Sequence, residues 1–154
     1  MLNFLKKNID LYAPVVGKAV KLEDVPDKMF AEKLLGDGIA FVFDTDVIYA
    51  PCDGEIIMIA ATKHALGIRA ANHAEIMIHI GLETVNFNGE GFTPLVKDGD
   101  KVKRGQGLIK IDRAFFEEHN ANLITPMVVT TKEYDLKLQE VSEVDCSSLV
   151  IRIR

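Results

Sequence analysis

The sequence predicts an all-β domain, an antiparallel sandwich or barrel with one or two short helical turns. Three observations lead to this class: apolar runs of strand length recur along the chain, Gly, Pro and Asp residues separate them, and helical periodicity is weak. Regularly spaced short strands with turn residues between them are typical of sandwiches and barrels. A length of 154 residues suits one domain, and a hydrophobic share of 48% is enough to fill its core.

The predicted strands alternate apolar and other side chains, or are apolar throughout. Successive side chains of a strand point to opposite faces, so alternation indicates a half-buried sheet. The runs expected to form strands are 39–43, 56–59, 64–69, 76–80, 108–111 and 149–153. Helical turns are expected only within 26–35 and 113–120.

A short internal echo points to a duplicated β motif. Residues 12–17 read YAPVVG and residues 49–54 read YAPCDG, and each copy leads into a β-like apolar segment. Both copies place Pro at the entry to a strand, where its missing N–H is tolerated. No Pro/Ser-rich linker or low-complexity tract divides the chain, so we expect one domain.

Composition argues against several classes of protein. A net charge of −5 is the wrong sign for a reader of phosphate backbones, so no nucleic-acid partner is expected. No apolar run approaches the ~20 residues of a transmembrane segment, and the N-terminus lacks the apolar stretch of a signal peptide. Cys52 and Cys146 form no metal-binding motif, which favours free thiols in a reducing cytoplasm.

Two of the four histidines lie in apolar, strand-like segments. His64 is eight residues before Asn72 and His79 is seven after it, so a hairpin turning there would bring the two imidazoles together. His73 and His119 lie in turn-like or polar surroundings and are expected at the surface. Facing imidazoles suit metal binding or nucleophilic phosphoryl transfer by a neutral ring nitrogen. Core histidines satisfied by hydrogen bonds are the structural alternative.

Other catalytic patterns are missing from the sequence. A metal hydrolase would need a third ligand and usually a carboxylate base, and the chain has no H-x-H or H-E-x-x-H pattern. It also has no nucleophile elbow, phosphate loop or dinucleotide-binding fingerprint. The spacing of the histidines alone therefore leaves a core pair, a metal pair and a phosphoryl site open.

Seven strings in fixed order make the prediction specific. They are APxxG at 13–17, EDVPDxxF at 23–30, GDGIA at 36–40, APxDG at 50–54, TKHAxGI at 62–68, IHIGLETV at 78–85 and GEGF at 89–92. Together they resemble the glucose-family enzyme IIA, a phosphocarrier of the bacterial phosphoenolpyruvate:sugar phosphotransferase system. The resemblance implies a β-sandwich of the duplicated-hybrid-motif type, with a lead segment at 1–10 and a single enzyme IIA domain at 11–154.

The resemblance also implies a role for each central residue. His79 corresponds to the phosphorylated nucleophile, His64 to the second histidine that stabilises the phosphoryl group, and Thr62 to a threonine that orients an active-site histidine. The implied activity is that of a phosphotransferase, a protein phosphohistidine relay in the cytoplasm. Phospho-HPr would be the donor and the IIB component of a sugar permease the acceptor.

A docking surface around the histidines follows from the same resemblance. Its expected positions are Met29, Phe30, Leu35 and Met77, with Glu83 where the family usually has Asp. Met77 shares strand parity with His79, which places both on one face. The relay needs no cofactor, although the two histidines could share zinc with a partner. The alternative function is a phosphorylation-dependent regulatory protein that binds enzymes or transporters through this face.

Overall fold

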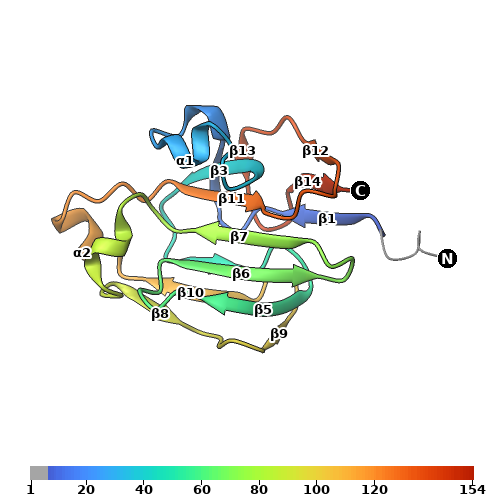
Figure 1. The fold of residues 1–154 in the computed structure, drawn as a ribbon. Coiled ribbons are helices and arrows are strands. Elements are labelled where there is room, and N and C mark those ends of the chain that lie inside the picture. The colour runs from blue at the N-terminus through green and yellow to red at the C-terminus, as the bar shows by residue number, and fades with distance from the viewer. Residues whose placement is uncertain (1–6) are drawn as a thin grey trace.

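Antiparallel pairing dominates the computed structural model, which describes residues 7–154 (Figure 1). The first six residues of the expected lead segment lie outside this range. The strands are β1 Ile9–Tyr12, β2 Gly17–Lys21, β3 Asp37–Phe43, β4 Val47–Tyr49, β5 Gly54–Ile59, β6 Ala65–Ala70, β7 Glu75–His79, β8 Phe92–Pro94, β9 Lys101–Val102, β10 Gly107–Ile111, β11 Thr125–Val129, β12 Leu136–Leu138, β13 Glu143–Val144 and β14 Leu149–Ile153. The helices are α1 Lys28–Ala31 and α2 Arg113–Glu118, with 3-10 turns η2 Leu22–Asp24 and η3 Thr84–Phe87.

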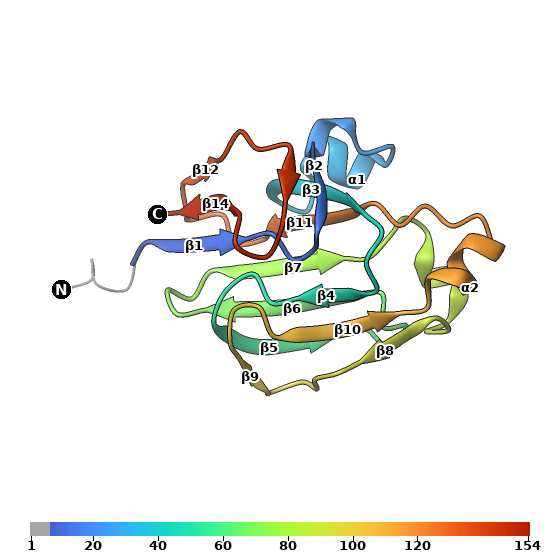
Figure 2. The ribbon, with the colours of Figure 1, turned by 180° about the vertical axis from the view of Figure 1, so that it is seen from behind.

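The strands form one large sheet and two small ones. The large sheet has the order β13-β2-β3-β11-β7-β6-β5-β9, and the small sheets are β1-β14-β12 and β4-β10-β8. Seen from behind, β4 and β10 run across the large sheet near β5 and β6 (Figure 2). Fully buried residues from all three sheets belong to one hydrophobic core, among them Phe41, Ile48, Ile78 and Ile151. The predicted antiparallel β fold with two short helices is confirmed.

The echo in the sequence is a pair of segments that bind each other. The N–H of Tyr12 donates to the carbonyl of Pro51 at 2.9 Å, and the N–H of Tyr49 donates to the carbonyl of Pro14 at 2.8 Å. The first residue of each copy thus contacts the third residue of the other copy. Such reciprocity is what a two-fold relation between two copies of one motif produces.

The same relation extends through the sheets. Gly17 in β2 pairs with Val144 in β13, and Gly54 in β5 pairs with Val102 in β9. A second echo, VKRGQGLIKI at 102–111 and VDCSSLVIRI at 144–153, ends in the central strands of the two small sheets. The copy that spans β4 to β10 lies in sequence between β3 and β11, which belong to the other copy.

The hairpin of β6 and β7 sets the positions of the two central histidines. Its turn contains Asn72, as the distances of His64 and His79 from this residue predict. The Asn72 side chain is only 1% exposed. The Asn72 side chain accepts from the N–H of Ala74 at 3.0 Å and donates to the carbonyl of Lys7 at 2.9 Å. Because both polar ends of this amide are satisfied, the turn is fixed, and the register follows with Ala65 opposite His79.

Helix α1 covers the end of the sheet where β7 terminates (Figure 1). The carboxylate of Asp27 caps it by accepting from the N–H of Met29 at 2.9 Å. Phe30, at 3% exposure, joins a second hydrophobic cluster with Val128 of β11 and with the partly buried Met77 of β7. None of the helices in 7–154 is long and apolar enough to cross a bilayer.

Candidate functional site

His64 and His79 face each other at one end of the β6–β7 hairpin. Their ring centroids are 4.8 Å apart and the ring planes are nearly perpendicular, at 83°. His79 is the last residue of β7, whereas His64 directly precedes β6 rather than lying within it. The carbonyl of His64 accepts from the N–H of Ile80 at 2.6 Å, which extends the ladder by one bond. The predicted juxtaposition of the two imidazoles is present.

A backbone carbonyl selects the tautomer of His79. Nδ1 of His79 lies 2.8 Å from the carbonyl oxygen of Gly81. A carbonyl oxygen can only accept a hydrogen bond, so Nδ1 carries the proton and Nε2 of the neutral ring keeps its lone pair. Gly81 adopts φ = +79°, a left-handed conformation that favours glycine. The turn after β7 thus leaves His79 with a free nucleophilic nitrogen.

Thr62 contacts His64, not His79. The Thr62 hydroxyl lies 2.6 Å from Nδ1 of His64. When the hydroxyl donates this hydrogen bond, the proton of the neutral His64 ring resides on Nε2. In that state His64 has an N–H donor available for a negatively charged group. The three residues expected to form the chemical centre are therefore linked in space.

Burial keeps both imidazoles in the neutral form. Desolvation lowers the pKa of His79 below its ordinary value, and the nearby His64 lowers it further. The Gly81 carbonyl and the charge of Asp27 act in the opposite direction with smaller effect. Desolvation also lowers the pKa of His64. Both rings are consequently neutral at pH 7, the state in which an imidazole nitrogen is a nucleophile.

These pKa shifts predict that acid weakens the fold. The unfolded chain binds more protons at these two positions than the native chain does. Their contribution to the free energy of unfolding should be complete above pH 6.5 and should be lost as the pH falls through the native pKa values.

Urea denaturation at pH 7.5 and 5.5 measures this difference in the free energy of unfolding. His79→Gln, which cannot titrate, should show a smaller difference, and an equal one would contradict the assignment.

The five positions expected for docking occupy different environments. Met29 is 46% exposed and Glu83 is exposed, whereas Leu35 and Met77 are half-buried and Phe30 is buried. Met77 and Phe30 belong to one cluster next to the histidines. Four of these five residues, all but Phe30, therefore present at least part of their side chains at the surface.

Phe30 instead forms a wall of the histidine site. Its ring centroid is 5.0 Å from that of His79, with the planes tilted by 57°. An apolar ring in this position removes water from one side of the imidazole, which accounts for part of the desolvation. Sequence periodicity cannot distinguish such a wall from a docking residue, because α1 is only one turn long.

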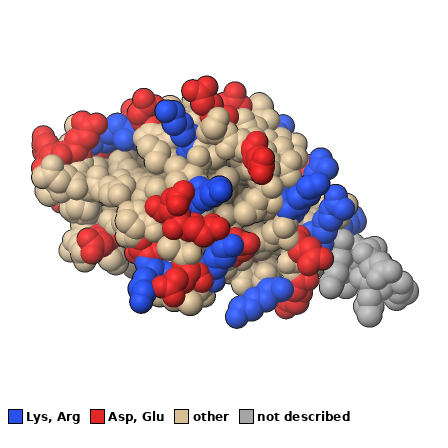
Figure 3. Space-filling model, turned by 90° about the horizontal axis from the view of Figure 1, so that it is seen from above, with Lys and Arg blue, Asp and Glu red and all other residues tan. Residues whose placement is uncertain are grey.

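Further exposed apolar side chains lie on the elements next to the site. Leu34, which follows α1, is 59% exposed, and Val85 of η3 is 46% exposed. Seen from the α1 side, the surface has a broad uncharged area with acidic and basic groups around it (Figure 3). Exposed apolar side chains such as Leu34 and Val85 on an uncharged surface are typical of protein–protein contacts. Val85 is the last residue of the IHIGLETV string, so the sequence contained a signal that this position belongs to the surface around the histidines.

No cluster of three or more potential ligands from His, Cys, Asp and Glu is present within residues 7–154. The histidine pair supplies two ligands, and a tetrahedral zinc site would have to complete its shell from water or another protein.

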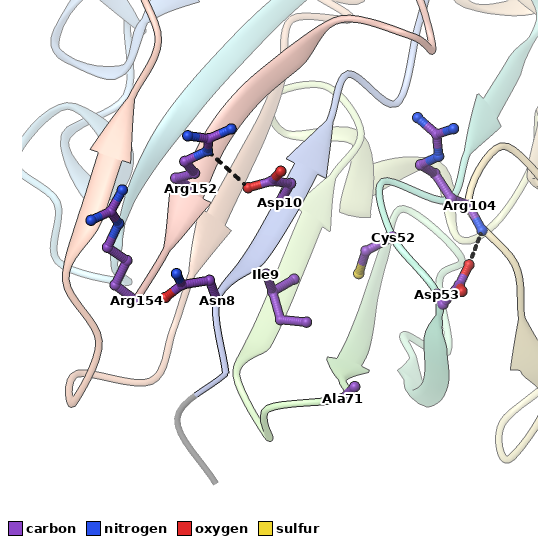
Figure 4. Close-up of a pocket in the computed structure, with 9 residues that line it drawn as sticks. All are labelled: Asn8, Ile9, Asp10, Cys52, Asp53, Ala71, Arg104, Arg152 and Arg154. Atoms are coloured by element: carbon purple, nitrogen blue, oxygen red, sulfur yellow. Dashed lines mark hydrogen bonds and ion pairs between the residues drawn. The ribbon is translucent and has the colours of Figure 1, made fainter. Parts of the chain in front are cut away.

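A cavity lined by several charged residues lies away from the histidine pair. This cavity of about 500 Å³ is found next to Ala71, in the turn at the opposite end of β7 from the histidine pair (Figure 4). Arg152 pairs through Nε with Asp10 at 3.1 Å, and the backbone N–H of Arg104 donates to Asp53 at 2.8 Å. Each carboxylate thus has a partner within the cavity wall, and none of these groups reaches the histidines.

Comparisons with known proteins identify relatives of this arrangement. Residues 9–134 match the sequence model of the family described as phosphoenolpyruvate-dependent sugar phosphotransferase system, EIIA 1. The chain is similar to the glucose permease IIA from Mycoplasma capricolum, with 31% identity, a TM-score of 0.87, and coverage of 95% of this chain and 96% of that one. Csd3 from Helicobacter pylori shares the fold alone, at 13% identity and a TM-score of 0.50 over 79% of this chain and 30% of that one.

Proposed function

Because the chain belongs to the EIIA 1 family of the phosphoenolpyruvate-dependent sugar phosphotransferase system, a family of phosphotransfer relay proteins, we propose that His79 is its phosphoryl acceptor. The donor is phospho-HPr and the acceptor is the IIB component of a sugar permease of the glucose type. The Mycoplasma relative, a glucose permease IIA, supports the glucose type. The relay operates in the cytoplasm.

One observation carries this proposal: the Gly81 carbonyl holds the proton of His79 on Nδ1. Nε2 attacks phosphorus in line with the donor, so that an N–P bond forms while the bond from phosphorus to the donor breaks. Charge spreads over the three equatorial oxygens in the transition state. The Nε2–H of His64 then stabilises these oxygens. Nδ1 keeps its proton throughout, so His79 needs no base to become a nucleophile.

The direct test is phosphorylation of the purified chain. We incubate it with radiolabelled phosphoenolpyruvate, enzyme I and HPr, and omit HPr in the control. The expected product carries one acid-labile phosphoryl group that peptide mapping places on His79. Label that survives acid, or that maps to another residue, would contradict the proposal.

A regulatory function through the same face is the second candidate. Met29 and Leu34 are exposed apolar residues beside the histidine site, and phosphorylation adds about −1.5 to −2 charges there. A partner that binds the apolar surface would be released on phosphorylation. Affinity capture with the unphosphorylated and phosphorylated chains, against known metabolic enzymes and transporters, separates this function from a relay. Equal capture by both forms would speak against it.

A further inference from the structure

The peptide unit between Gly81 and Leu82 is held at both ends. Its carbonyl accepts from Nδ1 of His79 at 2.8 Å, and its N–H donates to the carbonyl of Asn122 at 2.9 Å. In a trans peptide the N–H and the C=O point in opposite directions. The loop at Asn122 therefore decides where the Gly81 carbonyl points, although it is far from β7 in sequence.

The preceding peptide unit, between Ile80 and Gly81, is held by a side chain. Its carbonyl accepts from the hydroxyl of Thr84 at 2.5 Å, and Thr84 is fully buried. The N–H of Ile80 is already bonded to the His64 carbonyl. The Thr84 hydroxyl is the hydrogen-bond partner of a carbonyl that would otherwise rotate with Gly81, whose left-handed φ makes this turn sensitive to peptide rotation.

The methyl group of Thr84 packs against the same turn from another side. A Cβ placed on Gly81 would come within 2.6 Å of Cγ2 of Thr84 and 2.9 Å of the Asn122 carbonyl oxygen. The backbone at Gly81 is therefore packed closely between these two groups. The Thr84 side chain thus meets this turn with both ends: its hydroxyl bonds the Ile80 carbonyl, and its methyl group leaves no room for a side chain at position 81.

We propose that Thr84 is a positioning residue for phosphoryl transfer: its hydroxyl orients the turn so that the Gly81 carbonyl stays on Nδ1 of His79. This inference rests on the proposed function of His79 and names a residue that supports it without touching the phosphoryl group. Without the hydroxyl, the buried Ile80 carbonyl loses its partner, and the turn gains from rotating toward another donor. His79 could then carry its proton on Nε2, where it blocks attack.

The test compares Thr84→Val, which removes the hydroxyl and keeps the shape, with Thr84→Ser, which keeps the hydroxyl. Nitrogen-15 NMR of the histidine rings at pH 7.5 reports the tautomer directly in the unphosphorylated chain. We expect Nδ1–H for His79 in wild type and Thr84→Ser, and a mixture of tautomers in Thr84→Val. The rate of phosphorylation by phospho-HPr should fall about tenfold in Thr84→Val, the equivalent of one lost hydrogen bond.

Thr130→Val is the matched control. Its hydroxyl also donates to a backbone carbonyl, that of Glu75 at 3.3 Å, but at the opposite end of β7 from the histidine pair. It should leave the tautomer and the rate unchanged. If Thr84→Val does not fold, Thr84→Cys, with a weaker donor of similar size, should give a smaller shift of the same kind.

The two readouts separate this proposal from the proposed function. A wild-type chain that accepts no phosphate would refute the phosphoryl site, while the NMR result would still decide whether Thr84 sets the tautomer. A Thr84→Val protein of lower stability whose His79 remains entirely Nδ1–H, with an unchanged rate, would overturn the positioning role. Thr84 would then serve the turn alone.

Discussion

Replacing His79 by Gln should abolish phosphorylation, with a residual rate at least ~10³-fold below that of wild type. The substitution removes the nucleophile, and no neighbouring group can replace it at the same position. Gln keeps a polar side chain of similar size, so the fold should persist. Transfer of radiolabel from phospho-HPr, together with the urea midpoint as a control for folding, measures the effect. A His79→Gln protein that still forms acid-labile phosphate would refute the assignment.

His64→Gln provides the comparison within the same site. His64 is 4.8 Å from His79 between ring centroids and supplies a donor, not the nucleophile. The variant should still accept phosphate but should pass it on about 10²-fold more slowly, because the Gln amide, unlike the ring held by Thr62, is not a preorganised donor. Acceptance from phospho-HPr and transfer to a IIB protein are measured separately. Complete loss of acceptance would assign a larger role to His64 than stabilisation.

Replacing Gly38 by Ala should destabilise the protein strongly. A Cβ on Gly38 would lie 2.0 Å from the carbonyl oxygen of Met127, a backbone atom that cannot turn away. The side chain of Ala fits there only if β3 and β11 move apart, which breaks the pairing of residue 38 with Val128. We expect the free energy of unfolding to fall by about 3 kcal/mol or more, measured by urea denaturation.

Gly67→Ala is the matched control for this prediction. Gly67 lies in β6 of the same sheet, but an added Cβ would first meet the flexible side chain of Ile57 at 3.3 Å. The free energy of unfolding should change by less than about 1 kcal/mol, because that side chain can shift and alanine lowers the entropy of the unfolded chain. Equal losses in Gly38→Ala and Gly67→Ala would show that the close approach of Met127 is not the cause.

Local periodicity predicted the hairpin that carries the histidines. Ile76, Ile78 and Ile80 are buried while Met77 and His79 are only partly so, as alternation requires. The distances of His64 and His79 from Asn72 then placed the rings together. Both inferences depend on neighbours along the chain, which a sequence shows directly.

Long-range packing explains what the sequence reading missed. Strand β11 is buried along its whole length and contains Pro126, so neither alternation nor strand propensity marks it. Pro126 is tolerated because it precedes the ladder with β7, which begins at Met127. The Gly-Asp-Gly string at 36–38 reads as a turn, yet Gly38 is a strand residue beside Met127. Each of these features depends on which strand lies opposite in the sheet, and neighbouring residues in the sequence do not show which strand that is.

The contacts that orient the Gly81 peptide are non-local for the same reason. Asn122 reaches it from the loop after α2, and its role is played by a backbone carbonyl that any residue possesses. Thr84 gave a signal only as part of the IHIGLETV string. Only the fold shows that its hydroxyl holds the Ile80 carbonyl.

The reciprocal bonds between the two copies of the motif allow positions in one copy to be matched with positions in the other. Gly38 in one copy occupies the place of Ala65 in the other, since each lies five residues before the residue that pairs with Gly17 or Gly54. Their partners, Val128 and His79, are therefore counterparts. A histidine stands at this position in one repeat only. In the other repeat the corresponding residue, Val128, is apolar and belongs to one hydrophobic cluster with Phe30 of α1, whose ring lies against His79. The repeat without the histidine thus supports the wall of the site formed by the other.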